Sequence, residues 1–160
     1  MGINVGHRAS LGLAPAALAG LAAGIVMALV AMMATAVMGM GLFAAPAMIA
    51  GIVLGPEVAM SPGPGVIVTG LVLHMLLSMM FGVLFAVLVA RVRASTVGLG
   101  LFYGIALWII NFYVLSFVSA GARAMAGHEP VALAIGTHLI FGLVLGTIVA
   151  RSGKSLPASA

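Results

Sequence analysis

The chain has no cysteine and no aspartate among its 160 residues. Without cysteine it can form no disulfide, thiolate metal site or iron–sulfur cluster, and it has no cysteine nucleophile. Its two carboxylates, Glu57 and Glu129, lie in predicted connections, and neither a nucleophile elbow nor an HExxH motif occurs. The sequence therefore does not indicate a conventional enzyme.

Charged residues are also scarce. They make up 5% of the chain, against roughly 25% in soluble domains, while 64% of the residues are hydrophobic. Six basic and two acidic side chains cannot cover the surface of a soluble domain, so the composition predicts a chain surrounded largely by lipid. The net charge of +4 is too sparse for a nucleic-acid footprint, and we expect no nucleic-acid partner.

What the chain does have is four long apolar segments. They are predicted to form transmembrane helices over about residues 15–38, 65–90, 97–118 and 129–150. Each is at least about 20 residues long, which is enough to cross the hydrocarbon core at 1.5 Å per residue. We therefore predict one membrane domain over residues 1–160, an all-α up-and-down bundle of four transmembrane helices.

A shorter apolar segment, about residues 42–55, lies between the first two predicted spans. It is too short to cross a bilayer, and Pro46 interrupts it. We expect it to lie along the membrane surface or to enter the membrane as a re-entrant turn.

The basic residues predict the orientation, because cytoplasmic connections collect Lys and Arg. Only Arg123 falls on one side of the predicted spans. The other five basic residues fall on the opposite side: Arg8, Arg91, Arg93, Arg151 and Lys154. Both termini are therefore predicted to lie in the cytoplasm.

Small and polar residues recur every four positions in the second and fourth spans, which places them on one helix face. The two rows match without a gap, and their members are Gly70, His74, Ser78, Gly82 and Ala86 in one span and Ala134, His138, Gly142, Gly146 and Ala150 in the other. This match suggests the hypothesis of a duplicated two-helix hairpin.

Glycines at four-residue spacing also occur in the first and third spans. In lipid, small residues that allow close backbone approach mark the contacts between helices. We predict packing contacts, within the chain or with a partner, at Gly20, Gly24, Gly70, Gly82, Gly100, Gly104, Gly142 and Gly146.

An ionisable side chain inside a span is costly and is by default a functional candidate. His74 and His138 each lie nine residues into their predicted spans, roughly 13 Å deep at 1.5 Å per residue. The other helices and neighbouring positions contribute further groups to this predicted polar layer: Met32 or Met33, Ser78, Asn111 and Thr137.

Three interpretations of the layer stay open. It is a hydrogen-bonded polar cluster that only stabilises the helices, a cofactor site, or a path for protons or small solutes. As a cofactor site, His74 and His138 would hold a b-type haem, or copper with methionine thioethers. The sequence does not identify a metal.

The segment from Pro46 to Gly55, followed by Gly70-x-x-x-His74 and Gly82, resembles small uncharacterised bacterial four-helix integral membrane proteins. The resemblance covers most of the chain. It implies the four-helix architecture only and carries no activity. We further expect the chain to lie in a bacterial inner (plasma) membrane.

The expected function is that of an accessory or structural subunit of a membrane complex, because the connections are short and the small-residue rows favour helix partners. Its expected partners are the lipid bilayer and other membrane helices, in a homo-oligomer or a larger complex. The alternatives are a haem- or metal-binding electron-transfer module that uses His74 and His138, and a small oligomeric transporter or channel.

Overall fold

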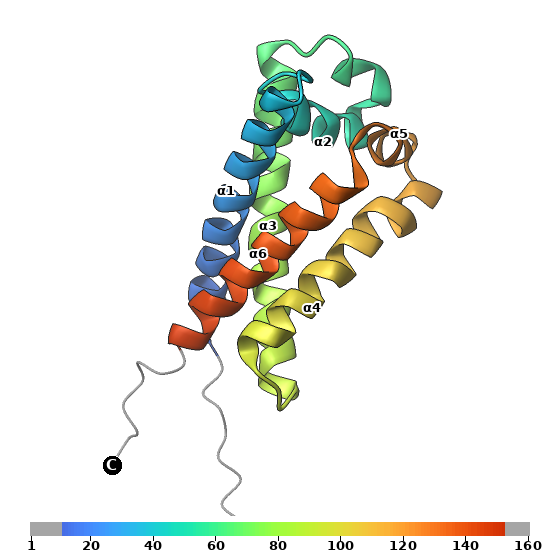
Figure 1. The fold of residues 1–160 in the computed structure, drawn as a ribbon. Helices are drawn as coiled ribbons and strands as arrows, with labels where there is room; N and C mark the ends of the chain where they lie inside the picture. The colour runs from blue at the N-terminus through green and yellow to red at the C-terminus, as the bar shows by residue number, and fades with distance from the viewer. Residues whose placement is uncertain (1–10, 153–160) are drawn as a thin grey trace, which may run out of the picture.

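The structure of the protein is a computed structural model, and it describes residues 11–152. Within that range the chain forms six α-helices and no strands. The α-helices are α1 (Leu13–Val37), α2 (Ala44–Leu54), α3 (Pro64–Arg91), α4 (Thr96–Ile109), α5 (Ala120–His128) and α6 (Val131–Ser152) (Figure 1). The basic residues Arg8 and Lys154, used above for the orientation, lie outside the described residues.

Four helical segments are long and apolar enough to cross a membrane: Leu13–Val37, Pro64–Arg91, Thr96–Phe117 and Val131–Ser152. The third of them is α4 continued by a π-helical turn, η2 (Ile110–Val114), and a 3-10 turn, η3 (Leu115–Phe117). The long helices run alternately up and down. The first turn of α1 and the last turn of α6 therefore lie at the same end of the molecule (Figure 1).

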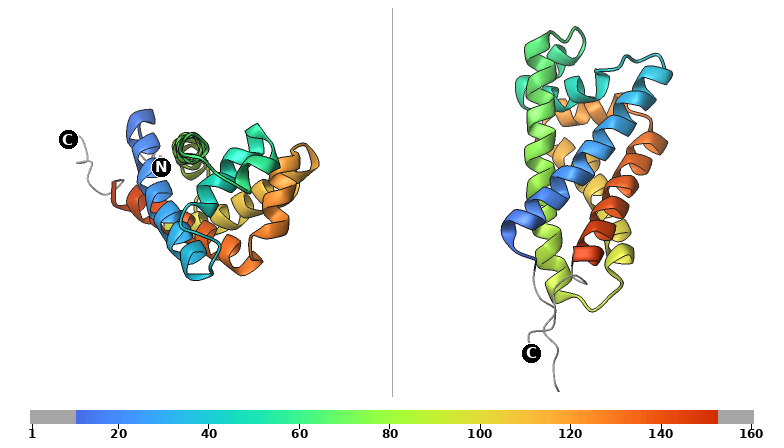
Figure 2. Two further views of the ribbon diagram at one scale, coloured as in Figure 1. Left: turned by 90° about the horizontal axis from the view of Figure 1, so that it is seen from above. Right: turned by 90° about the vertical axis from the view of Figure 1, so that its left-hand side faces the viewer.

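The predicted segment at 42–55 forms α2 and a 3-10 turn, η1 (Pro56–Ala59). Pro46 is the third residue of α2, in the first turn, where a missing backbone N–H costs no hydrogen bond. Gly55 ends the helix at a φ of 102°, a conformation that glycine adopts without strain. The helix crosses the end of the molecule opposite the first turn of α1 and the last turn of α6 (Figures 1 and 2).

The helix α5 was not predicted, since its residues were expected to form a loop. Ser119 caps it, because its hydroxyl accepts a hydrogen bond from the backbone N–H of Ala122 at 3.2 Å. α5 packs against α2. The Ser119 hydroxyl donates to the carbonyl of Ile52 at 2.9 Å, and a Cβ on Gly121 would collide with the carbonyl of Gly51.

Glycines set the closest helix crossings. Where α1 crosses α3, a Cβ on Gly20 would lie 2.8 Å from the Cα of Gly82. Where α4 crosses α6, a Cβ on Gly100 would lie 3.0 Å from the Cα of Gly146. The backbones are therefore in direct contact, at distances that no side chain larger than hydrogen allows.

The crossing of α1 with α3 corresponds to that of α4 with α6, whereas the short helices differ, since α2 packs against α3 and α5 packs against α2. Gly24 of α1 faces Ser78 of α3, and Gly104 of α4 faces the backbone of His138 and Gly142 of α6. Each pair of long helices also holds one short helix between its members in the chain. The match between the α3 and α6 rows thus extends to their neighbours in space.

The two helix pairs, α1 with α3 and α4 with α6, contact each other more closely on one side than on the other. α1 packs along α6, whereas the backbones of α3 and α4 approach at few positions and are bridged by side chains. Tyr103 of α4 donates a hydrogen bond to the carbonyl of Phe81 at 3.0 Å, and its ring lies 5.2 Å from that of Phe85.

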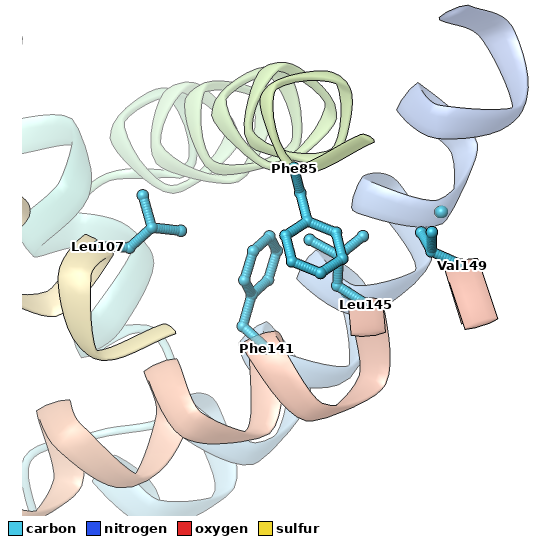
Figure 3. Packing of buried hydrophobic residues seen from close by; sticks show 7 residues of the cluster. Phe85, Leu107, Phe141, Leu145 and Val149 are labelled. Carbon is cyan, nitrogen blue, oxygen red and sulfur yellow. The ribbon is translucent and has the colours of Figure 1, made fainter. Parts of the chain in front are cut away.

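An apolar core fills the centre of the four long helices toward the termini. Phe85 of α3 lies against Phe141 and Leu145 of α6 (Figure 3). Leu107 and Val149 belong to the same cluster. These side chains are buried, and they occupy the space between the helix pairs at this level.

Candidate functional site: a polar cavity between the helices

Beyond the apolar core, a cavity of about 110 Å³ lies between the helices on the side of α2 and α5. All six α-helices contribute to its lining. Its walls are mainly apolar, and its polar side chains are His74, Ser78, Asn111, Glu129, Thr137 and His138. The cavity therefore collects most of the polar groups that the sequence places inside the spans.

The ring of His138 is hydrogen-bonded at both nitrogens. Its Nδ1 lies 2.8 Å from the carbonyl oxygen of Ala134, which can only accept, so Nδ1 carries the proton. In the neutral ring, Nε2 is then an acceptor, and the side-chain amide of Asn111 donates to it at 3.3 Å. The ring of Phe112 meets the imidazole edge-on at 5.8 Å. His138 is therefore fixed in position and in tautomer.

Asn111 lies in the π-helical turn η2, which follows α4 without a break. The N–H of Leu115 bonds to the carbonyl of Ile110, five residues earlier, where an α-helix would use a residue four earlier. Such turns are rare and occur frequently at functional sites. Here the turn carries Asn111, which reaches His138, and the buried Phe112.

His74 belongs to the other helix pair. Its Nε2 donates to the carbonyl of Gly24 in α1 at 2.9 Å, because a carbonyl oxygen can only accept. In the neutral ring, Nδ1 keeps its lone pair, and no described residue donates to it. A glycine is required at position 24, since a Cβ there would collide with the side chain of Ser78.

The two histidines line one cavity but share no hydrogen bond. Ser78 donates to the carbonyl of His74 at 2.7 Å, and Thr137 donates to carbonyls within α6. Met32 lines the cavity, whereas Met33 is 60% exposed on the outside of α1. Of the two methionines weighed for the layer, only Met32 is therefore in place to contribute.

The predicted packing glycines lie at contacts between helices. Gly20, Gly24 and Gly82 lie where α1 meets α3, and Gly70 of α3 meets the backbone of Pro46 in α2. The remaining four lie where α4 meets α6: Gly100, Gly104, Gly142 and Gly146. The rows of small residues thus form helix contacts within this chain.

Glu129, at the junction of α5 and α6, also lines the cavity, although it was expected where an outer loop meets the start of the fourth span. Burial raises the pKa of its carboxyl group from 4.5 to about 7. Within residues 11–152, no side chain donates a hydrogen bond to this carboxyl group and no cation lies within salt-bridge distance. The only sequence signal was its position next to Pro130, directly before an apolar span.

The cavity does not continue toward the termini. Phe141 and Leu107 form part of its lining and also belong to the apolar core cluster. Beyond them, Phe85, Leu145 and Val149 are buried. In this conformation the polar space is closed at one end.

The residues present do not fit a haem between the two histidines. A cavity of about 110 Å³ is well below the 300 to 1,000 Å³ of typical cofactor pockets. Nε2 of each histidine is already hydrogen-bonded. Among residues 11–152, no three of the side chains of His, Cys, Asp and Glu come together as metal ligands.

The comparisons with known proteins give no relative. No family model, curated protein or solved structure matches this chain. The cavity is therefore the feature from which a function can be inferred.

Among the described residues, one buried side-chain nitrogen has no hydrogen-bond partner, the Nε1 of Trp108. Its indole ring meets the ring of Tyr113 edge-on at 5.4 Å. Trp108 does not belong to the cavity lining, and we assign it no role in the site.

Proposed function

We propose that this chain is an integral protein of a bacterial inner membrane, with four spans in an up-and-down bundle and both termini in the cytoplasm. The four long apolar helices support the spans. Arg91, Arg93 and Arg151 at one end, against Arg123 at the other, support the orientation. α2 and α5 would then lie at the outer surface.

We further propose that the protein binds a small polar solute within the membrane, as part of its transport or sensing. The observation that carries this proposal is the cavity, which brings polar side chains from α3, η2 and α6 together with Glu129 in one space closed toward the termini. Intramembrane polar groups that face a cavity mark pathways for ions and substrates. A cluster that served stability alone would pair its groups, and Glu129 has no partner among the described residues.

A role as an accessory subunit has less support. It was inferred from small-residue rows that would invite partner helices, and these rows are occupied by contacts within the chain. The haem- or metal-based alternative is weakened by the size of the cavity. Binding of a small polar solute is therefore the function that these observations favour.

The test is solute binding by the protein in lipid nanodiscs, measured as a shift of the thermal unfolding midpoint across a panel of small cationic, neutral and anionic solutes. A ligand present at 100 times its Kd stabilises a folded protein by about 2.7 kcal/mol. Ala28→Leu fills the cavity from α1, and Ala22→Leu places the same bulk on the exposed face of that helix.

We expect at least one solute to raise the midpoint of the wild type and of Ala22→Leu but not of Ala28→Leu. If no solute shifts the midpoint, or if the cavity-filling variant responds like the control, the proposed site does not exist.

A further inference from the structure

The cavity offers unused hydrogen-bond acceptors. The Nε2–H of His74 is bound to Gly24, which leaves the lone pair of Nδ1, and the amide nitrogen of Asn111 is bound to His138, which leaves Oδ1. Neither atom accepts a hydrogen bond from a described residue. The hydroxyl groups of Ser78 and Thr137 are already donated to backbone carbonyls. A ligand that fits this space has to be a donor.

The cavity also carries an uncompensated carboxyl group. Glu129 is its one acidic side chain, and no Lys or Arg is present in the lining. The Glu129 side chain is half-buried in a mainly apolar lining, where its ionised form is stabilised by a nearby positive charge. The ionised carboxyl group therefore favours a ligand that brings positive charge.

The rest of the lining excludes a hard metal ion. Ca²⁺ and Mg²⁺ need about six oxygen ligands, whereas this lining is dominated by apolar side chains, among them Phe81, Phe112 and Phe141. Aromatic faces attract organic and ammonium cations. The volume of about 110 Å³ is smaller than the 150 Å³ of an engineered cavity that binds benzene, so the cation has to be small.

From these observations we propose that the cavity binds a small protonated amine, ammonium or a short alkylammonium ion. Glu129 supplies the negative charge, Asn111 and His74 supply acceptors for N–H groups, and the phenylalanine rings surround the alkyl group of an alkylammonium ion. This inference rests on the proposed solute site and specifies its ligand.

The experiment is isothermal titration of the full-length protein in nanodiscs with methylammonium chloride, potassium chloride and methanol. Methanol resembles methylammonium in size and lacks its charge, and potassium carries the charge without N–H donors. Glu129→Gln removes the counterion, and Glu57→Gln makes the same change at an exposed residue of η1, outside the cavity.

We expect methylammonium to bind the wild type and Glu57→Gln, and its affinity to fall at least about 10-fold in Glu129→Gln, since a charge-assisted pair is lost. Phe112→Leu keeps the carboxyl group and removes an aromatic face, and we expect a loss of about 2- to 30-fold. Retention of the wild-type thermal unfolding transition in the absence of ligand shows that each variant is folded.

The possible failures are distinct. If methanol or potassium binds as well as methylammonium, or if Glu129→Gln binds like Glu57→Gln, the amine assignment is wrong and the solute site remains. If methylammonium does not bind while neutral solutes are bound and are blocked by Ala28→Leu, the same holds. If nothing binds, both proposals are wrong.

Discussion

The side-chain amide of Asn111 donates a hydrogen bond to Nε2 of His138, with 3.3 Å between the two nitrogens. The bond joins the π-helical turn after α4 to the middle of α6, and it exists only while the imidazole is neutral and protonated at Nδ1. His74, in the other helix pair, bonds instead to Gly24. The two histidines therefore share the cavity without sharing a partner.

This arrangement predicts which stability effects are coupled. Asn111→Ala and His138→Ala should be non-additive in a double-mutant cycle, with a coupling free energy of about 0.6 kcal/mol and at most about 1.7, as for other hydrogen bonds between membrane helices. His74→Ala and His138→Ala should be additive in the absence of ligand. The measurement is reversible unfolding in detergent. Additive effects of the Asn111 and His138 substitutions would show that the bond contributes nothing.

The close contact of glycines between α1 and α3 predicts that one added methyl group strongly destabilises the protein. In Gly82→Ala, the new Cβ would lie 2.7 Å from the Cα of Gly20, a backbone atom that cannot move independently. We expect a loss of at least about 2 kcal/mol, typical of overpacked sites. In Gly98→Ala the Cβ meets only Ser95 at 3.6 Å, and alanine favours the helix by up to about 1 kcal/mol. Thermal unfolding of both variants makes the comparison, and equal midpoints would mean that α1 and α3 do not pack as described.

The proposed orientation predicts the compartment of each connection. A reporter fused after Arg93, in the turn between α3 and α4, and one fused at the C-terminus should both report the cytoplasm. A reporter inserted beside Arg123 in α5 should report the opposite side. A periplasmic signal at either of the first two positions would reverse the assignment.

Glu129 predicts a pH dependence of stability. Its pKa in the folded protein is raised from 4.5 to about 7, so the folded state holds a proton that the unfolded state releases at lower pH. The contribution of this carboxyl group to the free energy of unfolding is largest below about pH 4.5 and decreases as the pH rises. The decrease levels off above about pH 7 and amounts to at most about 3 kcal/mol. His74 of α3 and His138 of α6 are the other titratable groups in the cavity lining.

The difference in unfolding free energy between wild type and Glu129→Gln isolates the carboxyl group, because both histidines are unchanged in the variant. We expect the wild type to lose stability relative to the variant between pH 5 and 8, in the absence of amines. A difference that is constant across this range would show that the carboxyl group is not buried as described.

The ends of α3 could be predicted because each has a local cause in the sequence. The first residue of α3 is Pro64 and its last is Arg91, and the prediction of residues 65–90 differs from the helix by one residue at each end. α5 was missed because its nine residues contain few large apolar side chains, although Ser119 and the alternating alanines are local helix signals.

The cavity was only partly predictable. Depth along the helices placed His74, His138 and Asn111 in one layer, because the rise per residue is fixed. Depth did not reveal that Asn111 bonds to His138 and not to His74, since that depends on the rotation that the π-helical turn gives to residue 111. Glu129 was missed because most residues that line the cavity with it come from α1, α2 and α3, which are distant in the sequence.

The correspondence between the α1–α3 and α4–α6 crossings bears on how far the fold depends on the turn that joins α3 to α4. Each half holds its own glycine crossing, Gly20 with Gly82 and Gly100 with Gly146, while the turn between α3 and α4 joins two helices whose backbones meet at few positions. A break in the peptide chain at that turn would leave both crossings and the α1–α6 interface intact. Two separately synthesised polypeptides, cut between residues 93 and 96, could thus rebuild the cavity, with one histidine supplied by each fragment.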